Sequence, residues 1–335
     1  MPNEHDQGME GLQAALAARA TVKGWAEGLE VLELVRAAQR AGWLDQLRAE
    51  TTAAQLAAAT RVPVDQAENV LLVLAAAGVV EGTNPFQLTP AFDALVAGAS
   101  GVDLSTTLDA VELARERAAQ AVRPEPDAPN GAQGLRLARD WGVRATPGSR
   151  QLYQILYQSL PGYRDRLDRG GPLLDVGSGI GGVLLTTLTL FDKLRAVGVE
   201  IVPEVAAELG KRAEEAEVAG RAEIRAVDAR TLTDVEKFEV SFWAHEFFPV
   251  ETRADTLAVI LRALRPGGLL LVQELFPPRE EPTTRTALDR LFFEQQRTAF
   301  GRSAEELADE GRAAGFQEAD IIATPLGRLV MLRKP

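Results

Sequence analysis

The sequence predicts an α/β protein whose C-terminal half forms an open, doubly wound sheet and whose N-terminal half is mainly helical. From residue 173 onward, short apolar runs alternate with longer segments of helical periodicity. This alternation is typical of parallel strands joined by crossover helices. Ahead of it, Ala, Leu and Val recur at helical spacing over the first hundred residues. A chain of 335 residues is long for one domain, so two are expected.

The composition excludes several classes of protein. The formal net charge of -12 disfavours nucleic acid and anionic membrane surfaces as partners. The absence of cysteine and the presence of only two histidines argue against disulfides, thiolate chemistry and the common metal sites. The polar start predicts no targeting peptide, and no apolar run is long enough to span a bilayer. We therefore expect a cytoplasmic enzyme without a metal.

The N-terminal region carries clear boundary signals for short helices. Residues 1–12 are expected to be a disordered tail, and residues 13–100 a helical domain. Thr52 and Gln55 have the spacing of a capping box, and another helix is expected to begin near Pro63. Two short apolar runs then predict a small hairpin, followed by one more helix.

The order of three helices and a hairpin is that of a winged-helix unit. Such units often bind DNA, but residues 1–100 contain 12 acidic and only 6 basic side chains. A surface with this charge is repelled by a phosphate backbone. A packing or dimerisation domain is therefore favoured over a DNA-binding domain.

The remaining chain divides into a connector and the sheet domain. Residues 101–168 are expected to be a helical connector that contributes to a substrate pocket, with a Pro-rich loop over 122–134. The sheet domain is expected over 169–335. Its seven strands are predicted in the runs "PLLDVG", "RAVGVE", "AEIRAVD", "FEVSFWA" and "GLLLVQE" and in two final runs near 318–323 and 329–332.

The stretch "LLDVGSGIGG", residues 173–182, fits two cofactor fingerprints. Its glycines can be read as the G-x-G-x-x-G motif of dinucleotide-binding enzymes or as the loop that binds S-adenosylmethionine. In both, the absence of Cβ atoms lets the ligand approach the backbone, and the next helix offers free amides. Glu200 ends the following strand and could hold a ribose diol in either case.

Four other features favour S-adenosylmethionine. Asp175 lies within the first strand, where its carboxylate can order the loop or meet the cationic amino acid end of the methyl donor. Asp228 ends the third strand, where it can accept from an adenine amine. An Arg-Pro-Gly-Gly turn precedes the fifth strand. The Gly-rich loop also follows a helical domain in the sequence, and no separate substrate domain is expected after it.

With these motifs, residues 169–335 resemble the class I S-adenosylmethionine-dependent methyltransferases, which have a Rossmann-like seven-stranded sheet. The N-terminal half resembles that of the small-molecule O-methyltransferases, which are typically homodimers that interlock through a winged-helix domain. The resemblance implies ten cofactor-binding residues at the ends of the first four strands. They are Asp175, Gly177, Ser178, Gly179, Glu200, Ile201, Asp228, Ala229, Trp243 and Ala244.

The residue that removes a proton from the methyl acceptor is less evident. In the family that this chain resembles, a histidine beyond the fifth strand usually acts as the base, yet "LFPPREEPTTRTALDRLFFEQQRTAFG" contains none. The remaining candidates are His245, Glu246, Glu274 and Glu294. His245 has the most favourable position, at the carboxyl end of a central strand, although a structural hydrogen bond would explain it equally well. Glu274 could likewise cap a helix.

Aromatic residues near the predicted site suggest an apolar acceptor. Tyr153 and Tyr157 are four residues apart and share a helix face. The substrate-binding candidates are Tyr153, Tyr157, His245, Phe248, Phe292 and Phe293, with Phe247 and Phe276 as further apolar wall. Ordinary packing would explain the tyrosines as well.

The resulting hypothesis is methyl transfer from S-adenosylmethionine to a small, largely apolar or aromatic metabolite, by a homodimer that acts in secondary metabolism such as antibiotic biosynthesis. O-methylation is favoured, and N- or C-methylation stays open because the usual base is missing. The rival hypotheses are an NAD-dependent oxidoreductase and a winged-helix regulator that senses S-adenosylmethionine. A methyltransferase fold that performs another reaction is a further alternative.

Overall fold

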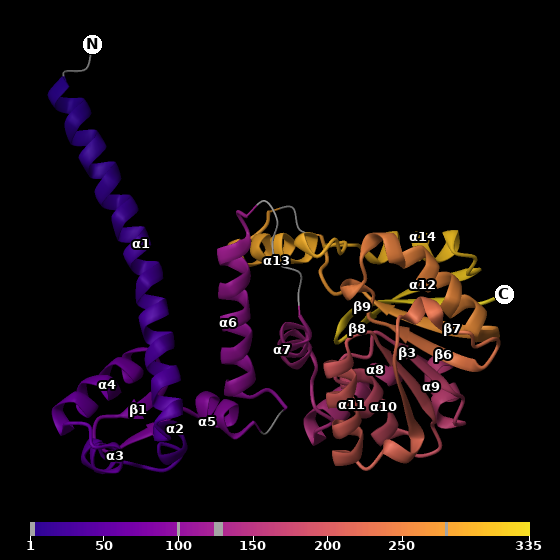
Figure 1. Ribbon diagram of the computed structural model, residues 1–335, viewed down its shortest axis with the longest axis horizontal. Helices are drawn as coiled ribbons and strands as arrows, with labels where there is room; N and C mark the ends of the chain where they lie inside the picture. The colour runs from indigo at the N-terminus through magenta and orange to yellow at the C-terminus, as the bar shows by residue number, and fades with distance from the viewer. Residues whose placement is uncertain (1–3, 99–100, 124–129, 279–280) are drawn as a thin grey trace. The chain divides into compact units, whose positions relative to one another are not determined.

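The computed structural model describes residues 4–98, 101–123, 130–278 and 281–335, without the side chains of residues 4–8 (Figure 1). Contacts divide the chain into two compact units, Met1–Ala99 and Ser100–Pro335. The connector expected over residues 101–168 therefore belongs to the same unit as the sheet.

The first unit is helical with one small hairpin. Thr52 and Gln55 form the expected capping box, since each side chain bonds to the other residue's backbone amide. Pro63 directly precedes the next helix. The elements are α1 (Glu4–Arg40), α2 (Trp43–Gln46), α3 (Ala53–Thr60), α4 (Val64–Ala76), β1 (Val80–Gly82), β2 (Phe86–Leu88) and α5 (Pro90–Ala97).

The N-terminal segment differs from the expectation. Residues 1–12 were expected to be disordered, but helix α1 begins at Glu4, and only residues 1–3 lie outside the described part of this segment. Glu, Gln, Met, Leu and Ala are strong helix formers, and a long helix adds one hydrogen bond for each further residue. These contributions offset the low helix propensity of Gly8 and Gly11.

The second unit begins with four helices ahead of the sheet. The middle of the expected Pro-rich loop, residues 124–129, lies outside the described residues. Asn130 and Gln133 then form a capping box that starts the second of these helices. The four are α6 (Leu104–Gln120), α7 (Gly131–Trp141), α8 (Pro147–Gln158) and α9 (Pro161–Asp168).

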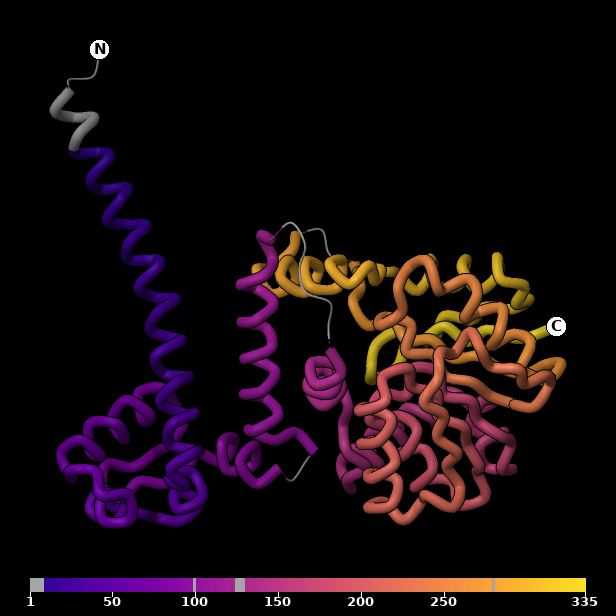
Figure 2. The backbone as a smooth tube through the Cα atoms, viewed as in Figure 1, coloured from indigo at the N-terminus to yellow at the C-terminus, as the bar shows by residue number. Residues whose placement is uncertain are grey.

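The sheet has the order β5-β4-β3-β6-β7-β9-β8. Neighbours from β5 to β7 run parallel, whereas β9 is antiparallel to both β7 and β8. The last strand, β9, yellow in Figure 2, thus lies beside β7, which precedes it by more than fifty residues. The strands are β3 (Leu173–Val176), β4 (Ala196–Glu200), β5 (Ala222–Ala226), β6 (Phe238–Trp243), β7 (Leu264–Gln273), β8 (Glu318–Thr324) and β9 (Gly327–Arg333).

Helices cover both faces of this sheet, which confirms the predicted doubly wound α/β fold. Residues that alternate along each strand point to two separate hydrophobic cores. Leu174 and Val176 pack with α12 and α14, while Leu173 packs with α8 to α11. The connecting helices are α10 (Gly182–Leu190), α11 (Pro203–Glu215), η1 (Ala219–Arg221), η2 (Ala229–Thr231), η3 (His245–Phe247), α12 (Val250–Ala263), α13 (Thr284–Gln295) and α14 (Ala304–Ala313).

The strand order reverses between β3 and β6, and this is where ligands bind in open α/β sheets. The loops after these two strands begin at Gly177 and Ala244. Among the described residues, no helix is long and apolar enough to cross a membrane. The same residues contain no cluster of three or more His, Cys, Asp or Glu that could hold a metal ion.

Candidate functional site

A cavity of ≈ 570 Å³ lies at the carboxyl ends of β3, β4, β5 and β6. Its volume is in the range of sites that enclose small molecules, roughly 300 to 1,000 Å³. Helices α6, α7 and α8 also contribute to its wall, through Arg117, Leu137, Trp141 and Tyr153 among others. The connector segment therefore does line the pocket.

The Gly-rich loop forms the floor at one end of the cavity. Gly177 has φ 76°, and a Cβ atom added there would lie 2.8 Å from Cε2 of Phe248. Gly179 has φ 53°, and an added Cβ would meet no described atom within 4 Å, so this residue faces open space. Left-handed backbone of this kind favours glycine. The loop is thus shaped to bring its backbone close to a ligand.

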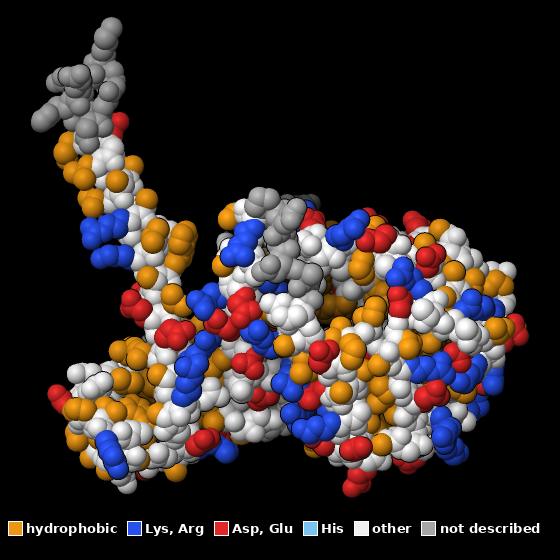
Figure 3. Space-filling model, in the orientation of Figure 1, with side chains coloured by type: hydrophobic (Ala, Val, Ile, Leu, Met, Phe, Trp, Pro, Cys, Tyr) orange, Lys and Arg blue, Asp and Glu red, His pale blue; other side chains and the backbone are white. Residues whose placement is uncertain are grey.

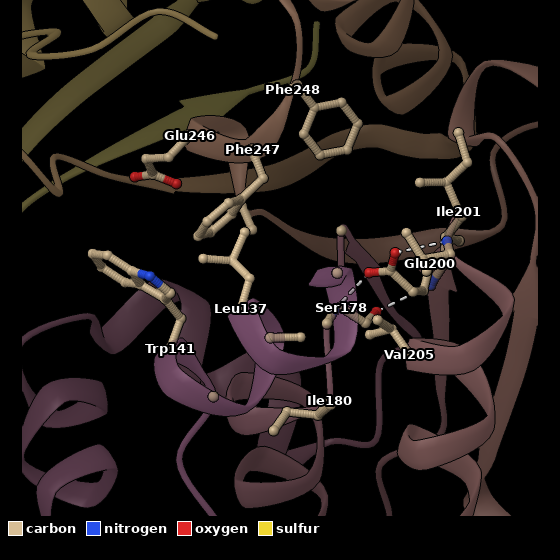
Figure 4. A pocket seen from close by; sticks show the side chains of 18 of the residues that line it. Leu137, Trp141, Ser178, Ile180, Glu200, Ile201, Val205, Glu246, Phe247 and Phe248 are labelled. Carbon is tan, nitrogen blue, oxygen red and sulfur yellow. Dashed lines mark hydrogen bonds between the residues drawn. The ribbon is translucent and has the colours of Figure 1, made fainter. Parts of the chain in front are cut away.

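Glu200 is held rigidly against this loop. Its Oε2 accepts from the Gly179 amide at 3.0 Å, and its Oε1 accepts from the Val202 amide at 2.9 Å, as the dashed lines in Figure 4 show. Burial raises the pKa of Glu200, and the backbone hydrogen bonds oppose that effect. The carboxylate lines the cavity, where its remaining lone pairs can accept from a ligand.

Asp175 is a buried carboxylate at the cavity wall. Its residue is only 1% exposed, and neither oxygen has a hydrogen-bond partner within the described part of the chain. Burial raises the pKa of Asp175 to about 7. The neighbouring Ser178 hydroxyl opposes this effect, and the charge of Glu200 acts in the same direction as burial. An unpaired buried carboxylate is costly unless a ligand supplies a positive charge or a donor.

The other predicted cofactor residues from β4 and β5 also line the cavity. Ile201 is exposed and projects along it (Figure 4). Asp228 caps η2 by accepting from the Arg230 amide at 2.9 Å, and it also pairs with the Arg230 guanidinium at 2.6 Å. This hydrogen bond to Arg230 lowers the pKa of Asp228. Ala229 lies beside it.

Two of the residues predicted at the end of β6 lie outside the described cavity lining. The described cavity lining includes Ala244 but neither Trp243 nor His245. Trp243 is 1% exposed and belongs to the hydrophobic core, because its position on β6 points it toward α12 and α14. The His245 imidazole is buried between the Gln273 carbonyl, 2.8 Å from Nε2, and Arg253, 3.2 Å from Nδ1. Both ring nitrogens are occupied, so His245 cannot take a proton from a molecule in the cavity.

Glu246 is the predicted base that does reach the cavity. Its side chain is 8% exposed, and Oε1 lies 2.9 Å from Nε2 of His245. This contact lacks hydrogen-bond geometry, and Oε1 has no other partner among the described residues. Figure 4 shows Glu246 grouped with Trp141 and Phe247 at one end of the cavity, while Glu200 and Ser178 lie toward the other.

Glu274, another predicted base, is engaged in structural contacts outside the described cavity lining. This carboxylate accepts from the Ala304 amide at 2.9 Å, at the start of α14, and pairs with Arg328 Nε at 2.8 Å. The hydrogen bond with Arg328 lowers the pKa of Glu274. Successive residues of a strand face opposite sides, so Gln273 lines the cavity and Glu274 does not. Glu294 has a side chain that is 59% exposed to solvent and is also outside the described lining.

The predicted aromatic substrate residues separate into two groups. Tyr153 and Phe248 line the cavity. Tyr157 is buried, with its hydroxyl 2.6 Å from the Thr187 hydroxyl, and Phe292 is buried too; neither is part of the described lining. The structure therefore does not present these two residues or His245 to a molecule in the cavity. Phe293 is also outside the described lining, and its ring packs against Trp141 and Phe247.

Sequence reasoning missed Trp141, the residue that organises the aromatic end. Its ring makes edge contacts with Phe247 at 5.9 Å, Phe276 at 5.5 Å and Phe293 at 6.2 Å between centroids. It also lines the cavity. The Asn130 capping box and the amphipathic pattern that follows were the available signals for helix α7, but they do not show which part of the sheet it covers.

Comparisons with known proteins agree with this geometry. Residues 173–268 match the family model of a methyltransferase domain. Comparison with curated protein sequences finds no match. The structure of the mitomycin 7-O-methyltransferase MmcR is similar, with 20% identity, a TM-score of 0.69, and coverage of 97% of this chain and 100% of that chain.

Two further solved structures are similar over both units. Human N-acetylserotonin methyltransferase in complex with S-adenosylmethionine has 16% identity and a TM-score of 0.67, covering 95% of this chain and 97% of that chain. The pyocyanin biosynthetic protein PhzM has 17% identity and a TM-score of 0.68, covering 96% and 100%. Together these findings show that the chain contains a methyltransferase domain at residues 173–268 and has the fold of the O-methyltransferases.

Proposed function

We propose that this enzyme transfers a methyl group to an oxygen atom of a small, largely apolar aromatic metabolite, with Glu246 as the base. One observation carries the proposal: a single cavity has two chemically different ends. The Gly-rich loop, Asp175 and Glu200 form one end, and Glu246 lies among aromatic side chains at the other (Figure 4).

The first end fits S-adenosylmethionine. The unpartnered oxygens of Asp175 can accept from the α-ammonium group of its methionine part. Glu200 can accept from the ribose hydroxyls, because each of its oxygens keeps a lone pair after bonding to the backbone. The open space above Gly179 leaves room for the cofactor to approach the loop.

The adenine would lie farther along the same wall. Ile201 is exposed into the cavity and can pack on the flat face of the base. Asp228 keeps lone pairs for the exocyclic amine although it also pairs with Arg230. Ala229 and Ala244 add small apolar surface, and Gly177 and Ser178 line the methionine part.

At the second end, the protein has to orient the acceptor, exclude water and remove a proton. When bound, S-adenosylmethionine would supply a methyl group on a sulfonium sulfur, and this sulfur is the leaving group of an in-line displacement at the methyl carbon. The acceptor oxygen forms the new bond to carbon, and the electron pair of the broken C–S bond stays on sulfur. Glu246 takes the hydroxyl proton. Trp141, Phe247 and Phe248 supply flat apolar surface for an aromatic acceptor.

The similar structures support a place in secondary metabolism. One is a mitomycin 7-O-methyltransferase and another a pyocyanin biosynthetic protein, so this fold serves pathways to such compounds. The acceptor of this enzyme would likewise be an intermediate of secondary metabolism, with a hydroxyl group and a flat ring that suits the aromatic end of the cavity.

A methyl-transfer screen tests the proposal. Purified protein is incubated with S-adenosylmethionine and a panel of hydroxylated aromatic compounds, each paired with its amino analogue, and products are detected by mass spectrometry. We expect a mass gain of one methylene unit on a hydroxyl compound, and a loss of turnover of roughly 10²- to 10⁴-fold in Glu246→Gln. Transfer only to amines, or full turnover in Glu246→Gln, would contradict the proposal.

We also propose that the protein is a homodimer formed through its N-terminal unit. Helix α1 carries large apolar side chains that are exposed in the single chain, and its Trp25 is 72% exposed. Figure 3 shows hydrophobic side chains along this helix. Exposed apolar surface of this extent is typical of protein interfaces. Light scattering should give twice the chain mass, and Trp25→Ser with Leu29→Ser should shift it toward the monomer; a monomeric wild type would refute the proposal.

A further inference from the structure

Arg253 is a buried cation that links the acceptor end of the cavity to the outer helices. It lies on α12 and is only 2% exposed. Its Nε and Nη2 donate to the two oxygens of Glu310 on α14 at 2.7 and 2.6 Å. Its Nη1 donates to the His245 carbonyl at 2.7 Å and lies 3.2 Å from His245 Nδ1. The guanidinium also lies 4.8 Å from the Trp243 ring centroid.

These contacts decide which nitrogen of His245 carries the proton. A guanidinium can only donate hydrogen bonds, so Nδ1 must be the acceptor and must lack a hydrogen. The hydrogen of the neutral ring is then on Nε2, where the Gln273 carbonyl accepts it at 2.8 Å. The same Nε2 is 2.9 Å from Oε1 of Glu246. The positive edge of the imidazole therefore faces the carboxylate.

We propose that Arg253 is a positioning residue that fixes His245 in its Nε2–H tautomer and thereby holds the Glu246 carboxylate toward the acceptor. Glu310 accepts two parallel hydrogen bonds from the guanidinium and thereby fixes the position from which Arg253 orients His245. With the opposite tautomer, the bare Nε2 lone pair would face Glu246 Oε1 and repel it.

This inference rests on the proposed role of Glu246, but its first test requires no substrate. The chain contains two histidines, so His5→Gln leaves His245 as the only imidazole. The ¹⁵N NMR spectrum of this histidine-labelled full-length protein should show a protonated Nε2 and an unprotonated, hydrogen-bonded Nδ1. A protonated Nδ1 with a bare Nε2 would overturn the inference without any further variant.

Three variants then locate the contacts. In Arg253→Met, Nδ1 loses its donor, so its signal should move and the second tautomer should appear. In Glu246→Gln, the Nε2 signal should shift while Nδ1 stays unprotonated. Arg302→Gln is the matched control, because Arg302 pairs with Glu310 from the loop before α14, and it should leave both signals in place. Unchanged signals in Arg253→Met or in Glu246→Gln would overturn the inference.

Kinetics with the acceptor from the screen provide an independent readout. Arg253→Met should lower kcat by roughly 10- to 100-fold with little change in KM, because a misplaced base slows the chemical step rather than binding. The affinity for S-adenosylhomocysteine should stay within about twofold, which shows that the fold is intact. Full turnover in Glu246→Gln together with the expected NMR signals would refute Glu246 as the base but would leave the tautomer assignment of His245 standing. Full turnover in Arg253→Met would refute the positioning role of Arg253.

Discussion

Replacing Asp175 with asparagine should remove a pH dependence from the stability of the cofactor-free protein. Burial raises the pKa of this carboxyl from 3.8 to about 7 in the folded state. The folded protein therefore keeps the Asp175 proton in a pH range where the unfolded chain has already lost it. The stability that results is complete below the unfolded pKa and is lost as the pH rises through about 7.

The magnitude follows from the two pKa values. The difference between the folded and unfolded pKa values corresponds to about 4 kcal/mol of unfolding free energy. Of this free energy, about 2 kcal/mol is lost between about pH 5.5 and about pH 8. Other groups titrate in the same range, so the relevant quantity is the difference between the wild type and Asp175→Asn. Asp192→Asn, at an exposed position, serves as the matched control.

Urea unfolding at several pH values measures this difference. Between about pH 5.5 and about pH 8, the free energy of unfolding should fall by about 2 kcal/mol more in the wild type than in Asp175→Asn. The affinity for S-adenosylhomocysteine should change in the opposite direction, rising with pH in the wild type only, because the α-ammonium group of the ligand pairs with the ionised carboxylate. Parallel stability curves for the two proteins would refute the assignment of Asp175 as an unpaired buried acid.

Three further substitutions should separate structural roles from binding roles. In Gly177→Ala, the added Cβ would lie 2.8 Å from Phe248 on a backbone with φ 76°. This substitution should lower the free energy of unfolding by about 1–3 kcal/mol and weaken S-adenosylhomocysteine binding. Wild-type affinity in calorimetry would show that the loop does not approach the ligand. Trp141→Ala should raise KM for the acceptor about tenfold without changing cofactor affinity, and an unchanged KM in steady-state kinetics would remove it from the acceptor end. Glu274→Ala should lower the free energy of unfolding by about 2–3 kcal/mol in urea, because the Ala304 amide loses its acceptor and Arg328 keeps only Glu305 as a partner. Cofactor binding should not change, and a large loss of affinity would contradict the structural role of Glu274.

Local patterns in the sequence were sufficient to predict the sheet and to bring the Gly-rich loop and Glu200 together at the cavity wall. The strand ending at Val176, the glycines that follow and the acid at Glu200 are separated by short, regular spacings. Residues at the ends of adjacent parallel strands must lie together, so these patterns place them without any long-range information. The capping boxes at Thr52 and Ser303 depend on residues only three apart and were predictable for the same reason.

Predictions at the acceptor end depended on long-range contacts, and several of the predicted residues lie outside the described cavity lining. His245 follows a central strand, but Arg253 from α12 and the Gln273 carbonyl from β7 turn its ring away from the cavity. Glu274 ends up on the opposite face of β7, where it pairs with Arg328. Trp141 precedes the sheet by some thirty residues, and only tertiary packing brings it over the loops.

Calorimetric titration with S-adenosylhomocysteine tests the central claim most directly. The wild type should bind this ligand and not NADH, and Glu200→Ala should lose about 2 kcal/mol of binding free energy, or about 30-fold in affinity. Glu214→Ala, an exposed acid on α11, should bind as the wild type does. Binding of NADH alone, or an undiminished affinity in Glu200→Ala, would contradict the assignment of the Gly-rich loop and Glu200 to the methyl donor.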